Sequence, residues 1–359
     1  MTKRIILFGP LPPPQGGVAI YLKELVGHLS GSGVCVWTYT GARSSHPNVR
    51  FVSHRRLGTL GALIAEGRRS RILDASHFHL EYPNPLLLPV WLFMKRCLQF
   101  EWYKNILDGS LPKRYPQFGP MQRWLFHRGV DAVDEFVVAS DELRRWLQED
   151  LKISQRVTVV PCLLPPTSGT VTNLPTETAR ALERYLSHDH RVCSIGVFFP
   201  SYGFKHVAEA VEELRRRSGK DIRLLLLDGG FVRDDAYRHE VLQNRDWITV
   251  IEEVPNSEVP QILKQSDVFV RAFGDESYGI SRIEALWAGI PVIATRAGET
   301  RGMLTYDFGD LDQLISHLQS VLFDASSHKE SQWPELYRKE AENNLAQLAE
   351  VLGIEIHAR

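Results

Sequence analysis

Short apolar runs alternate with amphipathic stretches along most of the chain. This alternation is typical of a parallel sheet covered by helices. In the first half, strands are expected near residues 4–9, 33–39, 75–80, 135–139 and 157–160. Helices are expected between them, notably over 18–30 and 141–151. The pattern predicts a first domain of the α/β class.

A second α/β series follows the segment 161–176, PCLLPPTSGTVTNLPT, which contains four prolines together with Ser, Thr and Gly. Such a composition is typical of a domain boundary. We therefore expect a first domain over 1–162 and a second over 163–329. The strands of the second are expected at 193–199, 222–228, 248–252, 267–273 and 290–295, and its helices near 204–217, 234–244, 257–265, 280–288 and 310–323.

Composition and charge limit the classes of partner. A chain of 359 residues with 43% hydrophobic content can bury two ordinary cores, and a net charge of −1 does not favour nucleic acid. The charge is unevenly shared, since residues 1–150 carry 19 Lys and Arg against 13 Asp and Glu, and the remainder carries 23 against 30. A basic first half favours an anionic partner, such as a lipid-linked acceptor or a membrane surface, although chance also produces such an asymmetry.

Cysteine usage and hydropathy indicate the compartment. The four cysteines are scattered without metal-ligand spacing, as in a reduced protein. The N-terminus, MTKRIILFGP, does not resemble a signal peptide, and no run of about 18 apolar residues occurs. We expect a cytoplasmic protein, with peripheral contact at the inner face of the membrane as a further expectation.

The segment 275–295, DESYGISRIEALWAGIPVIAT, carries the most specific chemistry. A loop leads into a helix that opens around Tyr278, Gly279 and Ile280, and the free N–H groups of a helix start suit a phosphate. Glu276 and Glu284 stand eight residues apart on either side of this opening, and carboxylates accept hydrogen bonds from sugar hydroxyls. Backbone N–H groups that bind phosphate, together with carboxylates that bind hydroxyls, suit a nucleotide-sugar ligand.

The extended pattern, Glu-x7-Glu followed by ALWAGIPVIAT, resembles the signature of retaining glycosyltransferases of family 4. The resemblance implies a GT-B fold, in which two Rossmann-like parallel-sheet domains face each other across a cleft. It also implies that the amphipathic tail, within 330–359, returns to complete the first domain. By the same resemblance, Glu276 faces the donor sugar and Glu284 the ribose. Because no DxD-like site occurs and the nucleotide-sugar is a substrate, neither metal nor cofactor is expected.

One loop departs from the family. Between Gly196 and Gly203, the family has an arginine and a lysine that pair with the donor diphosphate, whereas this chain has Val197 and Tyr202. Loss of both cations removes charge-assisted contacts to phosphate. Two substitutes are available in the sequence: Lys205 and Arg282. Lys205 also fits an ordinary surface position.

The first domain offers its own candidates. Gly16 and Gly17 lie between the first strand and first helix, where they resemble the family loop that touches the donor phosphate or acceptor; a plain turn is the alternative. His77 and His79 follow a predicted strand, and the alternating spacing makes at least one of them structural. Asp108 occupies the place where many family members have a histidine, and it either takes that role or caps a turn.

The segment 53–72 is predicted to be a helix with Leu57, Leu60, Leu63 and Ile64 on one side and five arginines beside them. Such a helix fits either an anionic membrane surface or an ordinary protein surface.

The expected activity is transfer of a sugar from a nucleotide-sugar to an acceptor hydroxyl, in polysaccharide or glycolipid assembly. Glu276, Asp108 and His79 are the candidate catalytic residues. The main alternative is a catalytically degenerate GT-B protein that binds a glycan or a partner, and a GT-B sugar-nucleotide epimerase is a third. The sequence leaves open the donor, the acceptor and the oligomeric state.

Overall fold

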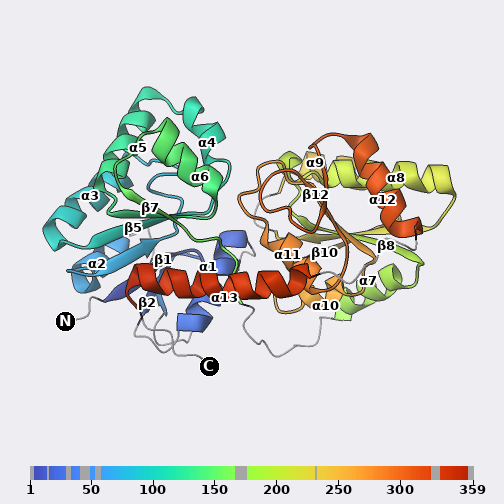
Figure 1. Cartoon of the computed structure of the whole chain (residues 1–359), viewed down its shortest axis with the longest axis horizontal. Helices are drawn as coiled ribbons and strands as arrows, with labels where there is room; N and C mark the ends of the chain where they lie inside the picture. Colours follow the sequence, from blue (N-terminus) through green and yellow to red (C-terminus); the bar gives the residue numbers. More distant parts are fainter. Residues whose placement is uncertain are drawn as a thin grey trace. The chain divides into compact units, whose positions relative to one another are not determined.

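The computed structural model describes residues 4–13, 16–29, 34–40, 49–52, 58–165, 176–230, 233–324 and 332–354. The chain divides into two compact units, of which unit 1 comprises Met1–Thr167 with Glu340–Arg359 and unit 2 comprises Ser168–Lys339. Each unit contains one parallel sheet covered by helices (Figure 1). The predicted linker 161–176 falls largely outside the described residues.

Unit 1 is built on a seven-stranded sheet with the order β3-β2-β1-β4-β5-β6-β7. Its strands are β1 (Ile5–Gly9), β2 (Cys35–Thr38), β3 (Val49–Phe51), β4 (Arg71–Asp74), β5 (Glu101–Ile106), β6 (Glu135–Val138) and β7 (Arg156–Val159). Its helices are α1 (Gly17–Leu29), α2 (Gly58–Glu66), α3 (Leu87–Leu98), α4 (Leu111–Arg114), α5 (Pro120–Ala132) and α6 (Asp141–Arg145).

Unit 2 is built on a six-stranded sheet with the order β10-β9-β8-β11-β12-β13. Its strands are β8 (His190–Gly196), β9 (Ile222–Asp228), β10 (Ile248–Glu252), β11 (Val268–Arg271), β12 (Val292–Thr295) and β13 (Leu304–Tyr306). Its helices are α7 (Thr176–Leu186), α8 (Phe204–Ser218), α9 (Asp235–Leu242), α10 (Val259–Leu263), α11 (Ile280–Trp287) and α12 (Leu311–Phe323). The prediction of two parallel α/β sheets is confirmed.

The last helix, α13 (Trp333–Leu352), belongs to both units. Near its start, the hydroxyl of Tyr337 donates to the carbonyl of Arg301 in unit 2, at 3.0 Å. Further along, the amide of Asn344 donates to the carbonyl of Leu163 in unit 1, at 3.0 Å. The unit division thus falls within the helix, before Glu340, whereas the prediction returned the chain to the first domain from residue 330.

The predicted strand over 75–80 is wrong, because β4 ends at Asp74. The Asp74 carboxylate accepts hydrogen bonds from the backbone N–H and the hydroxyl of Ser76, at 2.9 and 2.6 Å, and these close a turn. The strand β5 was missed. Its sequence EWYKNI contains Lys104 and Asn105, which are polar but 0% and 1% exposed. A polar residue inside a sheet hides the apolar pattern by which strands are recognised.

The predicted helix over 53–72 is also wrong in extent. Helix α2 ends at Glu66, Arg71 and Ile72 belong to β4, and 53–57 lie outside the described residues. Leu63 is buried but the neighbouring Ile64 is 61% exposed, so the expected apolar side does not form. Over the described part of the chain, no helix combines the length and hydropathy needed to cross a bilayer.

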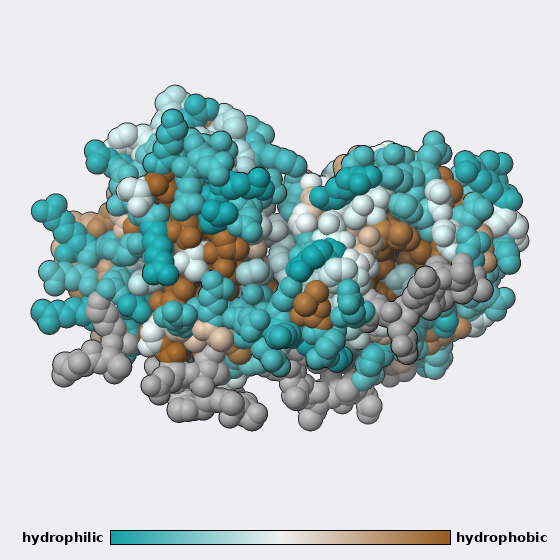
Figure 2. Space-filling model, viewed as in Figure 1, coloured by the Kyte–Doolittle hydropathy of each residue, from teal (hydrophilic) through white to brown (hydrophobic). Residues whose placement is uncertain are grey.

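Helices α8 and α12 share one hydrophobic core with the sheet of unit 2. Leu214 of α8 and Leu314 and Leu318 of α12 are at most 1% exposed in this cluster. Many hydrophobic side chains elsewhere are covered as well, and the molecular surface in Figure 2 is mostly hydrophilic with separate apolar areas.

Replacement of Leu318 by Ala should lower the free energy of unfolding by about 2–5 kcal/mol, because it removes buried methyl groups and leaves a cavity. Urea denaturation followed by circular dichroism measures the change. Gln319→Ala, an exposed change on the same helix, is the matched control and should be nearly neutral. Equal effects of the two substitutions would contradict the placement of α12 over the core.

Candidate functional site

The carboxyl edge of the unit 2 sheet has the geometry of a binding site. The chain runs outward from β8 to β9 in one direction and places β11 on the other side of β8. In open parallel sheets, ligands bind outside the carboxyl ends of the strands, where the strand order reverses in this way. The loops after β8, β11 and β12 meet at this edge, and the loop after β11 carries Glu276, Tyr278 and Gly279 into the start of α11.

Glu276 lies at this edge and is paired with Arg271, the last residue of β11. Arg271 Nε donates to Glu276 Oε2 at 2.8 Å, and both side chains are about nine-tenths buried, with 10% and 11% exposure. The Arg271 Nη1 also donates to the carbonyl of Ile195 in β8, at 2.6 Å. The pair therefore bridges the two strands between which the order reverses. Sequence reasoning missed Arg271, because its importance depends on this contact between strands.

Two glycines fix the backbone around Glu276. Gly279 has φ +93°, and a Cβ there would lie 3.2 Å from Glu276 Cγ and 2.9 Å from Arg282 Cδ. Gly298 has φ +73°, and a Cβ there would lie 3.0 Å from Glu276 Cγ. Because only glycine adopts such conformations without strain, both residues allow the loops to close on the carboxylate.

The start of α11 presents the backbone groups predicted for phosphate. Gly279 is its N-cap, without a side-chain cap, and Ile280 is its first residue. Tyr278 is buried, and its carbonyl accepts from Glu299 N–H at 2.9 Å. Glu284 lies one turn into the helix and is partly buried. Gly279 and the Tyr278 carbonyl thus lie close to Glu276, and Ile280 and Glu284 follow in the first turns of the helix.

Arg282 is placed differently from the expectation of a ligand-contacting cation. Its side chain is fully buried and donates to the carbonyls of Ala297 and Glu299 and to the Thr295 hydroxyl. Its Nε has no hydrogen-bond partner. Burial lowers the pKa of Arg282 to about 10, so it remains charged at neutral pH. Its hydrogen bonds hold the loop after β12 in place. Its positive charge can act on a ligand only by long-range electrostatic attraction and not by direct contact.

Lys205 is held by acidic residues of its own helix and of α9. Its ammonium pairs with Glu240 of α9 and lies 3.9 Å from Glu209 of α8. The hydrogen bond with Glu240 raises the pKa of Lys205. This arrangement favours the ordinary surface role that the sequence left open.

At the carboxyl edge of unit 1, the strand order reverses between β1 and β4. Gly16 and Gly17 stand at the start of α1, and the Gly16 carbonyl accepts from Ile20 N–H at 2.9 Å. A Cβ at Gly17 would meet nothing within 4 Å, so this helix start is open. The open position is compatible with the predicted contact to a phosphate or acceptor.

His79 belongs to a buried polar network beside β4. Its Nδ1 lies 2.7 Å from Asp74 Oδ2, its ring stacks on Trp91 with centroids 4.3 Å apart, and it is 4% exposed. This burial argues against direct contact with a substrate, so His79 is the structural histidine of the pair. His77, with 34% of its side chain exposed, reaches the surface, and its Nδ1 lies 3.9 Å from Glu81 Oε1.

Lys104 balances the charges of this network. Its ammonium is fully buried, donates to the Ser76 carbonyl at 2.5 Å, and lies 3.0 Å from Glu81 Oε2 and 3.7 Å from Asp74 Oδ2. Burial alone would raise the pKa of Asp74, but Lys104 and His79 outweigh it and hold the pKa well below its usual range. The network fixes the turn that carries His77.

Asp108 caps the loop after β5. It accepts hydrogen bonds from the backbone and hydroxyl of Ser110, at 2.9 and 2.7 Å, and pairs with Arg114 at 2.7 Å. Burial would raise its pKa, but Arg114 and Ser110 reverse that effect and lower it. An ionised, fully engaged carboxylate fits the turn-capping alternative better than a catalytic role.

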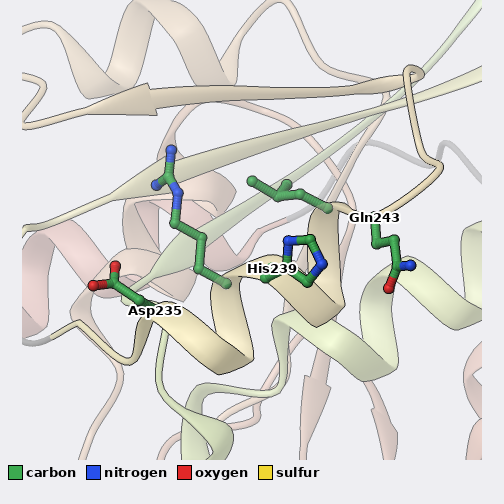
Figure 3. Close-up of a pocket in the computed structure, with 5 residues that line it drawn as sticks. Asp235, His239 and Gln243 are labelled. Atoms are coloured by element: carbon green, nitrogen blue, oxygen red, sulfur yellow. The ribbon is translucent and has the colours of Figure 1, made fainter.

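A pocket lined by Asp235, Arg238, His239, Leu242 and Gln243 lies along α9 (Figure 3). It contains none of the predicted site residues, and Arg238 pairs with Glu252 at 2.7 Å. We assign it no role. In the described ranges, no group of three or more His, Cys, Asp and Glu side chains is arranged to hold a metal ion.

Replacement of Asp74 by Asn should lower the free energy of unfolding at pH 7 by about 3–5 kcal/mol, because it leaves the buried Lys104 short of a partner. Since the folded-state pKa is depressed, the contribution of Asp74 is present above its unfolded pKa of about 3.9 and is lost as the pH falls below it. The gap between wild type and variant should therefore narrow in acid.

Urea denaturation at pH 7 and at lower pH measures this gap. Asp131→Asn, at an exposed position of α5, is the matched control and should be nearly neutral. An Asp74→Asn variant as stable as wild type at pH 7 would show that the network does not support the turn.

Comparisons with known proteins bear on this geometry. Residues 178–310, within unit 2, match the family model described as Glycosyl transferases group 1. The 2-deoxystreptamine glucosyltransferase of Streptomyces kanamyceticus is 27% identical over 225 residues, which are 59% of this chain and 56% of that protein. The chain thus spans little more than half the length of this relative. The trehalose synthase of Pyrococcus horikoshii is 25% identical over 311 residues, 79% of this chain and 71% of that protein.

A comparison with solved structures shows similarity in fold over nearly the whole chain. The crystal structure of HepE from Anabaena in complex with UDP-glucose has a TM-score of 0.73, at 16% identity, and covers 97% of this chain and 99% of that chain. The shared fold confirms the GT-B architecture for nearly the whole chain, and the likeness to glycosyltransferases in sequence is confirmed over residues 178–310.

Proposed function

We propose that the protein transfers a sugar, with retention of configuration, from a nucleotide-sugar to the hydroxyl of an acceptor. Unit 2 binds the donor. One constellation carries the proposal: the Arg271–Glu276 pair lies beside the glycine-capped start of α11, the helix that also contains Arg282 and Glu284. The solved relative that binds UDP-glucose has the same fold.

The charges at this edge favour an anionic ligand. Arg271 has one carboxylate partner, Glu276, while the buried Arg282 donates to carbonyls and a hydroxyl. The positive end of the α11 dipole adds to the two guanidinium groups. Burial lowers the pKa of Arg282, and the nearby carboxylates of Glu276 and Glu299 only partly offset this effect; a bound diphosphate would further stabilise the buried charge. The same groups would stabilise negative charge that develops on the departing diphosphate.

The carboxylates account for the sugar part of the donor. In the proposal, Glu284 binds the ribose hydroxyls and Glu276 binds hydroxyls of the transferred sugar. The resemblance to family 4 favours attack by the acceptor hydroxyl from the side of the leaving group, which retains the configuration. No step requires a metal or a cofactor. The acceptor binds at the carboxyl edge of unit 1, where His77 reaches the surface.

Addition of nucleotides should identify the donor. A ligand that binds only the folded state raises the melting temperature, so one of UDP, GDP, ADP or TDP, or its sugar conjugate, should stabilise the wild type. Glu284→Ala should lose most of that shift, because its ribose contacts are gone. Thermal-shift measurements with each nucleotide test this.

Glu335→Ala, an exposed glutamate on α13, is the matched control and should respond like wild type. Sugar release from the identified donor, followed with and without acceptor glycans, then separates the enzyme from the alternative of a degenerate binding module. Binding without turnover under any acceptor would favour that module, and no response to any nucleotide would overturn the proposed function.

The acceptor is proposed to be lipid-linked, in glycolipid or polysaccharide assembly, and reached at an anionic membrane surface. The support is an apolar surface on unit 1, defined by five large side chains on and next to α3 and α5 that are at least 43% exposed: Leu86, Val90, Phe93, Met121 and Trp124. The two helices pack together at Leu88 and Gly129.

Basic residues accompany this surface. Lys95 and Arg96 lie in α3, and Arg123 and Arg128 lie in α5, whereas Asp131 is the acidic residue of the two helices. The Arg128 guanidinium lies 5.6 Å from the Trp124 ring. Exposed apolar and aromatic side chains beside arginines are typical of proteins that lie on anionic lipid.

Replacement of Phe93 and Trp124 by Ser should reduce binding to vesicles that contain anionic lipid several-fold, because two apolar anchors no longer enter the interface. Co-sedimentation with vesicles of phosphatidylcholine and phosphatidylglycerol measures it. Ile64→Ser, an equally exposed apolar residue of α2, is the matched control and should leave binding unchanged. A stronger effect of Ile64→Ser would return the membrane contact to the segment first predicted from the sequence.

A further inference from the structure

We propose that Arg271 supplies the diphosphate-binding cation that positions 197 and 202 lack, and that the donor draws it away from Glu276. The inference rests on the proposed function and names the residue that gives the site its preference for a diphosphate. It assigns Arg271 two alternative partners, a carboxylate in the donor-free protein and a phosphate in the complex.

The position of Arg271 is the first argument. The loop after β8 has Val197, which is fully buried, and Tyr202, whose ring stacks on Phe273 with centroids 4.4 Å apart. The Arg271 guanidinium lies 5.2 Å from the Tyr202 ring and 5.1 Å from the Phe273 ring. A positive charge therefore stands beside position 202, although it comes from another strand.

The environment of the guanidinium fixes its orientation. The aromatic pair formed by Tyr202 and Phe273 supports it by cation–π contact, and the Ile195 carbonyl accepts one of its N–H groups. A planar guanidinium held in this way can present donors to phosphate in a fixed direction. An aromatic at 202 thus fits a site whose cation arrives from β11.

The other cations near this edge have different partners. Lys205 pairs with Glu240, and Arg282 is enclosed by the loop after β12. Arg271 retains 10% exposure of its side chain and has Glu276 as its ion-pair partner. Among these three cations, Arg271 is therefore the one that can meet a ligand without breaking a structural contact to another helix.

The ion pair with Glu276 links diphosphate binding to sugar binding. While Glu276 accepts from Arg271 at 2.8 Å, the guanidinium uses part of the hydrogen-bonding capacity of Oε2 that a sugar hydroxyl could otherwise use. A diphosphate offers arginine two strong acceptor oxygens, so the guanidinium gains a charge-assisted pair as it leaves the carboxylate. Diphosphate binding would thus free Glu276 for the sugar that follows it.

Calorimetric titration of the wild type and variants with a nucleoside, its monophosphate, its diphosphate and the sugar conjugate tests the inference. Arg271→Gln should weaken the diphosphate about 10- to 100-fold, the range of a charge-assisted pair, and leave the nucleoside unchanged. Glu276→Gln should strengthen the diphosphate, because it no longer competes for Arg271, and should lose the additional affinity that the sugar provides. Arg271→Lys should keep part of the diphosphate affinity.

Arg296→Gln is the matched control, since Arg296 follows β12 in the same unit but pairs with Asp307 at the surface. A purely structural pair would give another result: Arg271→Gln would weaken nucleoside and diphosphate alike, and Glu276→Gln would not strengthen either. That result overturns the inference and leaves the proposed function intact. Failure of the wild type to bind any nucleotide overturns both, and the two failures are thereby distinguished.

Discussion

The contact between Arg271 and Glu276 depends on one constraint, the reversal of strand order beside β8. Because all strands of the sheet are parallel, their carboxyl ends lie along one edge, and the reversal separates the connecting loops there. β11 lies next to β8 although 71 residues separate the end of one from the start of the other. Because the two strands are neighbours, Arg271 of β11 lies beside Tyr202 in the loop after β8 and beside Glu276 before α11.

The same constraint organises unit 1, where it has a different chemical result. Between β1 and β4, the edge combines an open helix start at Gly17 with a buried network around Asp74 and Lys104. At the carboxyl edge of unit 2, the guanidinium groups of Arg271 and Arg282 lie near the start of α11, an arrangement that suits a phosphate. Unit 1 neutralises its charges internally and leaves His77 at the surface.

Much of this was accessible from the sequence because it depends on local patterns. Most strands were predicted within a few residues, since their apolar runs are continuous. The segment around Glu276 and Gly279 was identified because its chemistry is contiguous in the chain. The failures at β4 and β5 have separate causes. β5 carries the polar residues Lys104 and Asn105 into the sheet, and the turn after Asp74 is closed by side-chain hydrogen bonds.

The sequence by itself determined the two parallel sheets and the likeness of the second unit to glycosyltransferases, because period and motif are properties of neighbouring residues. Only the tertiary structure decided which charged residues are available. In the folded protein, Arg282 and His79 are buried, Lys205 forms an ion pair with Glu240, and Arg271 lies beside Tyr202. Burial and pairing depend on residues far apart in the chain, so no local pattern reports which cation remains free to exchange its partner.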